Sequence, residues 1–473
     1  MSDFYFTTTL PYVNATPHLG FAWEILTGDF ICRYQRGMGK NVIFNTGTDE
    51  HGQKIYQKAL SLNLTPQAYT NQAVKPFRQL ISLLGLKVDN FIRTSDTKHL
   101  SAAQHMWQRC LAKGDIYKKK YTTKYCVGCE LEKTDSELVN GRCPLHPQQE
   151  LELRQEDNYF FRFSKYTSAL LAHYQNHPHF VIGKGKMKEL ISFVSAGLQD
   201  FSISRVKAKM PWGVAVPDDP TQVMYVWFDA LVSYLSTLNW PEPQQPWENF
   251  WPGVQICGKD NLRQQAAMWQ AMLLSAGIPL SKQILVNGFI TVDGEKMSKS
   301  VGNVIAPQDL VNRYGKDASR CIIASLPTFS DDVDITAQRL DKTYTALLVN
   351  GLGNLSSRLA KLASDANCSG SDYASSKTFS IELQEALNNY QTNGGWQTIV
   401  NKIAQLDQTL SQQKPWLITQ LAAKKAVLLP LLAAFSQICT DLQIYAPNTA
   451  ATLKSHFQSG KITPLKPLFP RLK

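Results

Sequence analysis

Three consecutive stretches near the start of the chain decide its fold class: FYFTTTL (residues 4–10), GFAWEILTGDFICRYQRGMG (20–39) and NVIF (41–44). The first and third are aromatic or β-branched runs typical of strands, whereas the second has helical spacing and ends at two glycines. This succession predicts a βαβ unit, and therefore an α/β fold with a parallel sheet. Because ligands bind beyond the carboxyl ends of such strands, PYVNATPHLG (11–20) and GTDEHG (47–52) are expected to face one cleft.

The rest of the chain divides where its character changes. A basic, cysteine-bearing region interrupts the α/β pattern, which then returns and finally gives way to purely helical spacing. We predict four segments: a first Rossmann half (1–116), an insertion with a metal-binding knuckle (117–222), a second Rossmann half (223–340) and an α-helical bundle (341–473). A core stripe with helical spacing is expected from five leucines of the last segment: Leu348, Leu352, Leu355, Leu359 and Leu362.

The composition excludes some classes of protein. The 473 residues can bury several cores, and the formal charge of +11 suits either a polyanionic partner or an ordinary charged surface. The N-terminus does not resemble a signal peptide, and no apolar run approaches the ~20 residues that span a bilayer. The nearest, AVLLPLLAAF (426–435), is expected to be broken at Pro430. We expect a soluble, cytoplasmic protein without a membrane partner, and a monomer by default.

A cysteine-rich stretch predicts a metal site. CVGCELEKTDSELVNGRCPLH (126–146) places Cys126 and Cys129 two residues apart, and then Cys143 and His146 two residues apart. Four such ligands close a tetrahedron around zinc with no position left for water, so we expect a structural Zn²⁺. The alternative is a coincidence of buried thiols.

Two further motifs are suited to phosphate chemistry. His18 falls in the first turn of the predicted helix, where free backbone N–H groups and the helix dipole attract phosphate. Phe21 lies three residues further on the same face but cannot donate a hydrogen bond. GEKMSKS (294–300) presents Lys296 and Lys299, which could neutralise a leaving pyrophosphate, although lysine-rich turns are also common on surfaces.

Together these motifs resemble those of the methionyl-tRNA synthetase family of class I aminoacyl-tRNA synthetases. The resemblance runs the whole length of the chain in family order, and also includes SISR (202–205), YVWFDAL (225–231), GKD (258–260) and GEKMSKSVGNV (294–304). It implies a Rossmann catalytic domain split by a zinc-bearing insertion and followed by a helical anticodon-binding domain. The implied reaction forms methionyl-adenylate from methionine and ATP with Mg²⁺, and then transfers the amino acid to tRNA(Met).

The resemblance also implies roles for individual residues. His18, Lys296 and Lys299 would be catalytic, and Gly20, Phe21 and Ser298 would join them in binding ATP. Asp49 would hold the α-ammonium group of the amino acid. The rest of the substrate site would consist of Pro11, Tyr12, Trp227, Ala230, Tyr234 and Gln265. Asn354, Arg358 and Trp416 occupy the anticodon-reading positions, where an exposed aromatic ring can stack on an unpaired base.

The chain departs from the family pattern at two positions in the cleft, because Phe21 and Gln265 both stand where the family has histidine. The main hypothesis is a methionine–tRNA ligase handicapped by Phe21, in which Phe21→His would speed amino-acid activation at least tenfold. One alternative is a paralogue that passes the activated amino acid to a small nucleophile. Another is a non-catalytic RNA-binding protein that keeps the fold.

Overall fold

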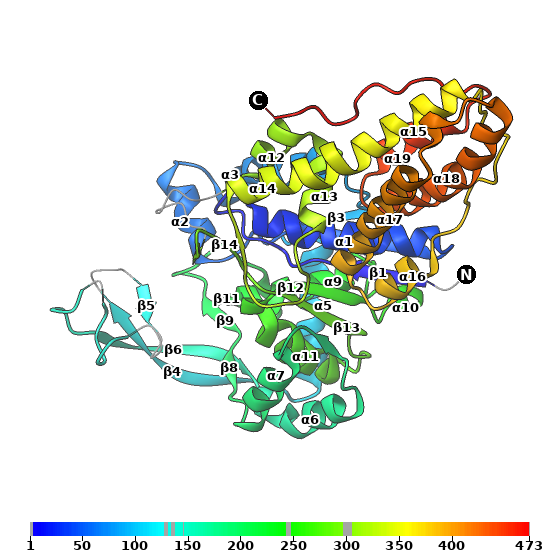
Figure 1. Ribbon diagram of the computed structural model, residues 1–473. Coiled ribbons are helices and arrows are strands. Elements are labelled where there is room, and N and C mark those ends of the chain that lie inside the picture. The colour runs from blue at the N-terminus through cyan, green and yellow to red at the C-terminus, as the bar shows by residue number, and fades with distance from the viewer. Residues whose placement is uncertain are drawn as a thin grey trace.

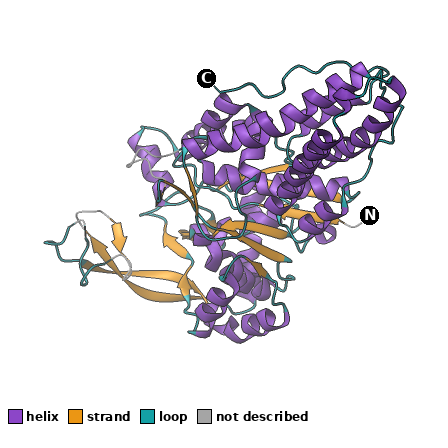
Figure 2. Cartoon of the chain, in the orientation of Figure 1, coloured by secondary structure: helices purple, strands orange, loops and turns teal. Residues whose placement is uncertain are grey.

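The computed structural model describes residues 3–126, 131–133, 138–144, 146–242, 247–296 and 305–472. Its centre is a six-stranded parallel sheet in the order β3-β2-β1-β12-β13-β7. The strands are β1 (Asp3–Thr7), β2 (Asn41–Thr48), β3 (Asn90–Arg93), β7 (Val181–Ile182), β12 (Val254–Gly258) and β13 (Gln283–Asn287). Figures 1 and 2 show the sheet in the middle of the molecule, with the insertion on one side and the helical bundle on the other. The predicted α/β fold with a parallel sheet is confirmed.

The first βαβ unit forms as expected, with one difference. Helix α1 (Leu19–Gly37) follows β1 and ends at the predicted glycines. Strand β2, however, continues four residues beyond NVIF, to Thr48. Polar side chains can lie in this strand because they bond to neighbours, as when the Asn45 amide donates to Thr7 Oγ1 over 2.9 Å.

Further helices pack around this sheet and carry the chain between its strands. In the first half they are α2 (Gln53–Ser61), α3 (Pro66–Ala73), α4 (Lys75–Leu84) and α5 (Thr97–Ala112). After the insertion follow α8 (Val226–Ala230), α9 (Ser233–Ser236), α10 (Trp247–Phe250), α11 (Trp269–Ala276), α12 (Pro307–Tyr314) and α13 (Lys316–Ala324).

The insertion projects from the sheet as a long antiparallel ribbon (Figure 1). The ribbon consists of β4 (Ile116–Cys126) and β6 (Glu152–Phe161), flanked by β5 (Leu131–Lys133) and β8 (Phe201–Ser202). Helices α6 (Thr167–Asn176) and α7 (Lys186–Ser195) follow it, and β9 (Ser204–Val206), β10 (Ala215–Val216) and β11 (Asp219–Met224) form a small separate sheet.

The bundle begins after a last small sheet of β14 (Ile290–Val292), β15 (Glu295–Lys296) and β16 (Val333–Ile335). Its helices are α14 (Ala337–Thr343), α15 (Asn354–Asp365), α16 (Ile381–Asn388), α17 (Thr392–Gln413), α18 (Leu421–Asp441) and α19 (Pro447–Phe457). All five leucines of the predicted stripe are buried, which confirms that interpretation. The π-helical conformation of Tyr344–Gly353, between α14 and α15, was not predicted from the sequence.

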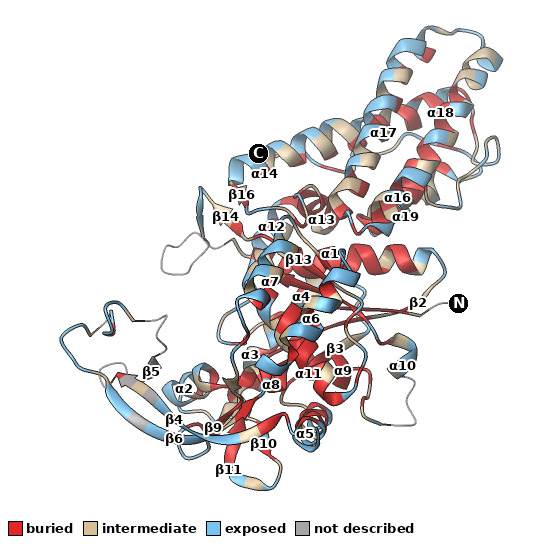
Figure 3. Ribbon diagram, turned by 90° about the horizontal axis from the view of Figure 1, so that it is seen from below, coloured by how far each residue is buried: buried red, intermediate tan, exposed pale blue. Residues whose placement is uncertain are grey.

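Pro430 interrupts the apolar run, but it does not interrupt the helix. Helix α18 runs through this proline as one element, because Leu428, Leu431 and Leu432 bury its apolar side and compensate for the missing N–H. By length and composition alone, residues 421–444 are apolar enough to span a membrane. However, 61% of the 18-residue window that meets this criterion is buried inside the molecule. Such burial is typical of a core helix, and Figure 3 shows α18 buried on the side that faces the other bundle helices.

Two clusters of buried apolar side chains hold the molecule together. One combines β1, α1, β2, α4 and α13 with the whole bundle, and the other combines α5, the insertion helices and α8–α11.

The first cluster contains a fully buried guanidinium, that of Arg320 in α13. Arg320 donates to the Asp29 carboxylate of α1 over 2.7 Å and to the carbonyl oxygen of Tyr445 over 2.7 Å. Tyr34, further along α1, donates from its hydroxyl to Asn388 Oδ1 of α16 over 2.8 Å. Helix α1 is therefore packed into both the catalytic half and the bundle.

Candidate active site

His18 caps the N-terminus of α1 at the mouth of the cleft. Its Nδ1 accepts a hydrogen bond from the backbone N–H of Gly20 over 3.1 Å, which fixes the ring against the first turn. A neutral imidazole that accepts at Nδ1 carries its proton on Nε2, so the ring presents a donor at its other nitrogen. The exposed His18 thus combines an oriented imidazole with the positive end of a helix dipole.

Phe21 lies one turn inside the same helix and is only 8% exposed. Its ring packs edge-on against Phe77 of α4, with the ring centroids 6.0 Å apart. The phenyl group therefore belongs to the first apolar cluster. A histidine at this position would need a polar partner in place of that contact.

The loops at the ends of β1 and β2 lie side by side, as the sequence predicted. The N–H of Asp49 donates to the carbonyl of Pro11 over 3.0 Å, and the N–H of Val13 donates to the carbonyl of Asp49 over 3.3 Å. Tyr12 and Asp49 thus form a parallel bridge that continues the pairing of the two strands. This pairing brings Pro11, Tyr12 and Asp49 together at the carboxyl edge of the sheet.

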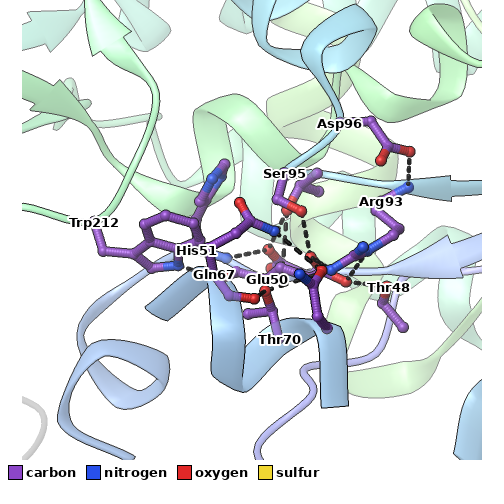
Figure 4. Close-up of polar contacts among 12 residues, drawn as sticks. Thr48, Glu50, His51, Gln67, Thr70, Arg93, Ser95, Asp96 and Trp212 are labelled. Carbon is purple, nitrogen blue, oxygen red and sulfur yellow. Dashed lines mark hydrogen bonds and ion pairs between the residues drawn. The ribbon is translucent and has the colours of Figure 1, made fainter. Parts of the chain in front are cut away.

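Glu50 is fully buried and fully compensated, although the sequence analysis assigned it no role. Figure 4 shows its carboxylate surrounded by donors. Arg93 donates to both carboxylate oxygens, over 2.7 Å and 2.8 Å, and Thr48 and Ser95 donate over 2.9 Å and 2.5 Å. The indole N–H of Trp212 donates to the backbone carbonyl of Glu50 over 2.6 Å. This network fixes the backbone on which Asp49 stands.

Asp49 is equally buried but poorly satisfied. It accepts from the backbone N–H of His51 and from the Thr94 hydroxyl, both over 3.5 Å and both at Oδ1. No lysine or arginine in the part of the chain that the structure describes forms an ion pair with it. Burial, and after it the charge of Asp229, raise the pKa of the Asp49 carboxyl well above its ordinary value. A buried carboxylate in this condition is suited to receive a cationic group.

Asp229 is a third buried carboxylate, which the sequence analysis did not identify. His51 Nδ1 lies 3.1 Å from its Oδ2, and His99 Nε2 lies 3.3 Å from its Oδ1. Burial alone would raise the pKa of Asp229, but the attraction to His51 and hydrogen bonds from both imidazoles hold it below its ordinary value. The sequence signal was its place in WFDA, between Trp227 and Ala230, which we had assigned to the substrate pocket.

Two residues of the pocket expected for the amino-acid side chain, Tyr234 and Gln265, belong to a chain of buried, hydrogen-bonded polar groups. The Gln265 amide donates to the Tyr234 hydroxyl and accepts from Gln255 over 2.9 Å. Tyr234 and Gln265 are both buried, as is Ala230, whereas Trp227 is partly exposed. The structure therefore brings Tyr234 and Gln265 into direct contact, and Gln265 serves as both donor and acceptor.

Glu24 of α1 is a further buried acid that sequence reasoning missed. It accepts from the backbone N–H and the hydroxyl of Thr9, over 2.8 Å and 2.6 Å. Burial raises the pKa of Glu24 to about 7, and its charge contributes to the raised pKa of the Tyr234 phenol. Its only sequence signal was an acidic residue in the middle of an otherwise apolar helix.

The lysine-bearing loop is described only at its base. Lys296 ends β15, its side chain is not described, and Ser298 and Lys299 lie outside the described residues. The base is anchored by Asp334, which accepts from the N–H of Gly294 over 2.7 Å and from the Thr291 hydroxyl over 2.9 Å. The roles of the two lysines therefore stay predictions.

Three of the four predicted metal ligands come together. The ligand atoms of Cys126, Cys143 and His146 all lie within 4.8 Å of one another, and Cys126 Sγ is 3.6 Å from His146 Nδ1. A tetrahedral zinc with bonds of about 2.3 Å to sulfur and about 2.0 Å to nitrogen separates these two atoms by about 3.6 Å. The donor set fits the metal, and Cys129 lies outside the described residues.

The three residues assigned to anticodon binding gather on the bundle. The Arg358 guanidinium of α15 lies over the Trp416 ring, 5.8 Å from its centroid, and also pairs with Asp407 of α17. Trp416 is 45% exposed in a short turn between α17 and α18, and Asn354 is exposed one helical turn before Arg358. An exposed aromatic ring next to a cation is suited to stacking with a base.

Comparisons with known proteins agree with this geometry. The family model described as tRNA synthetases class I (M) matches residues 4–152 and 136–360. A methionine–tRNA ligase of Nostoc sp. is 44% identical over 75% of this chain and 68% of its own length. The Rhizobium meliloti enzyme of the same name is 34% identical over 99% of this chain and 98% of its own. The solved Mycobacterium tuberculosis methionyl-tRNA synthetase, in complex with methionyl-adenylate, superposes with a TM-score of 0.87 at 31% identity, covering 100% of both chains. The chain therefore belongs to the methionine–tRNA ligase family of class I tRNA synthetases.

Proposed function

We propose that this chain is a methionine–tRNA ligase, which forms methionyl-adenylate from methionine and ATP and transfers the methionyl group to tRNA(Met). The observation that carries the proposal is Asp49, a buried carboxylate with two long hydrogen bonds at the carboxyl edge of a parallel sheet. An α-ammonium group supplies the positive charge that this site lacks. The full-length similarity to methionine–tRNA ligases supports methionine as the amino acid.

The remaining cleft residues act around this anchor. Trp227, Ala230 and Tyr234 receive the side chain, because aromatic and apolar groups suit a polarizable thioether. Pro11, Tyr12 and Gln265 complete this part of the site. His18 and the first turn of α1, with Gly20 and Phe21, receive the phosphates of ATP–Mg²⁺. Lys296, Ser298 and Lys299 stabilise the charge on the departing pyrophosphate.

The insertion and the bundle serve the reaction without taking part in its chemistry. We assign a structural Zn²⁺ to Cys126, Cys129, Cys143 and His146, where it would tie together the tip of the β4–β6 ribbon. On the bundle, Asn354, Arg358 and Trp416 bind the anticodon of tRNA(Met). We further propose a soluble, cytoplasmic monomer divided into the four segments stated above.

The decisive experiment is ATP–pyrophosphate exchange across a panel of amino acids, followed by aminoacylation of tRNA. Methionine should support exchange, and tRNA(Met) should accept the product. Asp49→Asn should lower kcat/KM for methionine by about 10²–10³-fold, because the ammonium group loses its charged partner. Exchange with a different amino acid, or transfer only to a small nucleophile, would favour a paralogue with another substrate. Lack of exchange with every amino acid would leave an RNA-binding protein.

The proposed zinc is tested separately. Metal analysis of the purified protein should find one zinc per chain. Cys143→Ser should lose it while the parallel sheet stays folded, because the knuckle lies at the tip of the ribbon. A metal-free protein with normal aminoacylation would contradict this assignment.

A further inference from the structure

Asp49, Glu50 and Asp229 are buried carboxylates whose charges are compensated in different ways. Glu50 has a bidentate arginine and two hydroxyl donors. Asp229 has two imidazoles, and Asp49 has only two long hydrogen bonds. The charge of Glu50 is thus neutralised by an arginine. The charge of Asp229 is met by two imidazole groups, each of which can be neutral.

The geometry around Asp229 is built from four elements. His51 follows β2, His99 lies in α5, Asp229 belongs to α8, and Ser236 of α9 lies 3.0 Å from His99 Nδ1. Asp229, His99 and Ser236 have no exposed surface, and His51 is nearly buried. Because an ionised carboxylate only accepts, each imidazole must place a proton on the nitrogen that faces Asp229. The side chain is therefore held in one orientation, and His51 links it to Asp49, because the backbone N–H of His51 donates to Asp49 while its imidazole contacts Asp229.

We propose that Asp229, held between His51 and His99, is a positioning residue whose negative charge strengthens the attraction of the Asp49 site for the ammonium group of the amino acid. The inference rests on the proposed function, because it takes Asp49 as the ammonium ligand. Asp229 acts through the electrostatic potential that its charge creates at the ammonium position, and not by contact with the substrate. In a site largely closed to water, one charge several ångströms away still changes ligand affinity substantially.

The other charged and titratable groups around Asp49 do not duplicate this effect. Glu50 is paired with Arg93, and the phenol of Tyr12 stays neutral. For Tyr12, burial raises the phenol pKa first, and the charges of Asp49 and Asp229 raise it further. His51 and His99 face Asp229 itself. A substitution of Asp229 therefore removes a negative charge near Asp49 without leaving another charged group unpaired.

The test compares two ligands that differ only in the amine: methioninol and the same alcohol without its amino group. Asp229→Asn should weaken methioninol binding about tenfold, while binding of the amine-free alcohol changes less than twofold. Asp229→Glu, which keeps the charge, should restore the preference for the amine. Equal losses for both ligands, or no loss for either, would overturn the proposal and leave Asp229 as a structural residue.

The pH dependence of methioninol binding provides a second test, because the proposal predicts the direction in which its acidic limit moves. Because the charge of Asp229 contributes to the raised pKa of Asp49, its removal should move the acidic limit of methioninol binding to lower pH. The variant would thus bind more weakly at neutral pH but stay active further into acid. A merely loosened site would lose affinity at every pH.

Controls separate this inference from the proposed function. Asp115→Asn removes another buried carboxylate, one that accepts from Tyr166 and Ser275 away from the cleft, and should leave the ratio of the two affinities unchanged. If Asp49→Asn leaves that ratio unchanged, the ammonium site itself is wrong. If only Asp229→Asn leaves it unchanged, the present inference alone fails. Should Asp229→Asn not fold, Asp229→Ser removes the same charge and leaves space for water, and it must give the same result.

Discussion

The cleft around Asp49 and the bundle surface around Trp416 both combine charged and aromatic residues, but in opposite surroundings. In the cleft, Glu50 and Asp229 have no exposed surface, and each charge is met by a partner from another element. On the bundle, Arg358 pairs with Asp407 while both side chains stay about a third exposed. An ion pair is therefore expected to contribute strongly to folding stability in the buried cleft and only weakly on the exposed surface of the bundle.

The largest contrast should come from removing one arginine in each region. Arg93→Met leaves the Glu50 carboxylate buried without its cation, which should cost about 3–5 kcal/mol in the free energy of unfolding. Arg358→Met, the matched control, breaks a solvated pair and should cost at most about 1 kcal/mol. Urea denaturation of both variants measures the difference. Similar losses would mean that burial does not distinguish the two regions.

The second contrast concerns pH. The pKa of Glu24 is raised from 4.5 to about 7 in the folded state, so its stabilising contribution is complete below pH 4.5 and is lost as the pH rises through 7. Glu24→Gln abolishes this loss. The stability of the natural protein relative to the variant should fall by on the order of 3 kcal/mol across that window.

An acid on the bundle should behave in the opposite way. Glu382 is exposed, and a backbone hydrogen bond, together with Lys402, lowers its pKa. Glu382→Gln should therefore produce only a small change, of opposite sign. Denaturation at about pH 5 and about pH 8 tests both variants, and a pH-independent difference for Glu24→Gln would contradict the burial argument.

The third contrast concerns tRNA. Trp416→Ala should weaken binding of a tRNA with a CAU anticodon by about 1–3 kcal/mol and barely affect other tRNAs, because it removes a stacking surface. Leu417→Ala is the matched control, since Leu417 lies in the same turn and is 68% exposed. Equal weakening for every tRNA would assign Trp416 to a nonspecific contact.

The smallest expected change in catalytic rate is at Phe21 of α1. Phe21→His should raise methionine-dependent exchange about tenfold, because it adds a donor near the phosphates. It should also lower stability by about 1–3 kcal/mol, because the imidazole replaces the contact with Phe77 inside an apolar cluster. Exchange rates and melting temperatures should be measured on the same preparations. If the natural protein already reaches the variant's rate, Phe21 is no handicap.

The sequence predicted those features that depend on local pattern. Alternation of strand and helix, the glycines that end α1 and the spacing of the leucines were sufficient for the fold class and for the bundle core. The motifs likewise assigned Asp49, Tyr234 and Gln265 to the substrate site, and these roles stay predictions. What could not be predicted depends on partners distant in sequence: Asp229 is 178 residues from His51, and Arg320 is 291 residues from Asp29. The continuous helix at Pro430 is a similar case, because helix propensity is local and the packing that overrides it is not.

The packing of α1 also has a consequence for the order of events during synthesis. Asp29 is made early, but its partner Arg320 is translated about 290 residues later, and the bundle face that covers Tyr34 later still. At roughly 5–20 residues per second, Asp29 is paired with its helical neighbour Arg33 but lacks Arg320 for something like 15–60 s. During that time α1 can pack against β1, β2, α4 and, once it is made, β12, but not yet against the bundle. The N-terminal half emerges first from the ribosome, yet it can reach its final packing only when the last helices have been made.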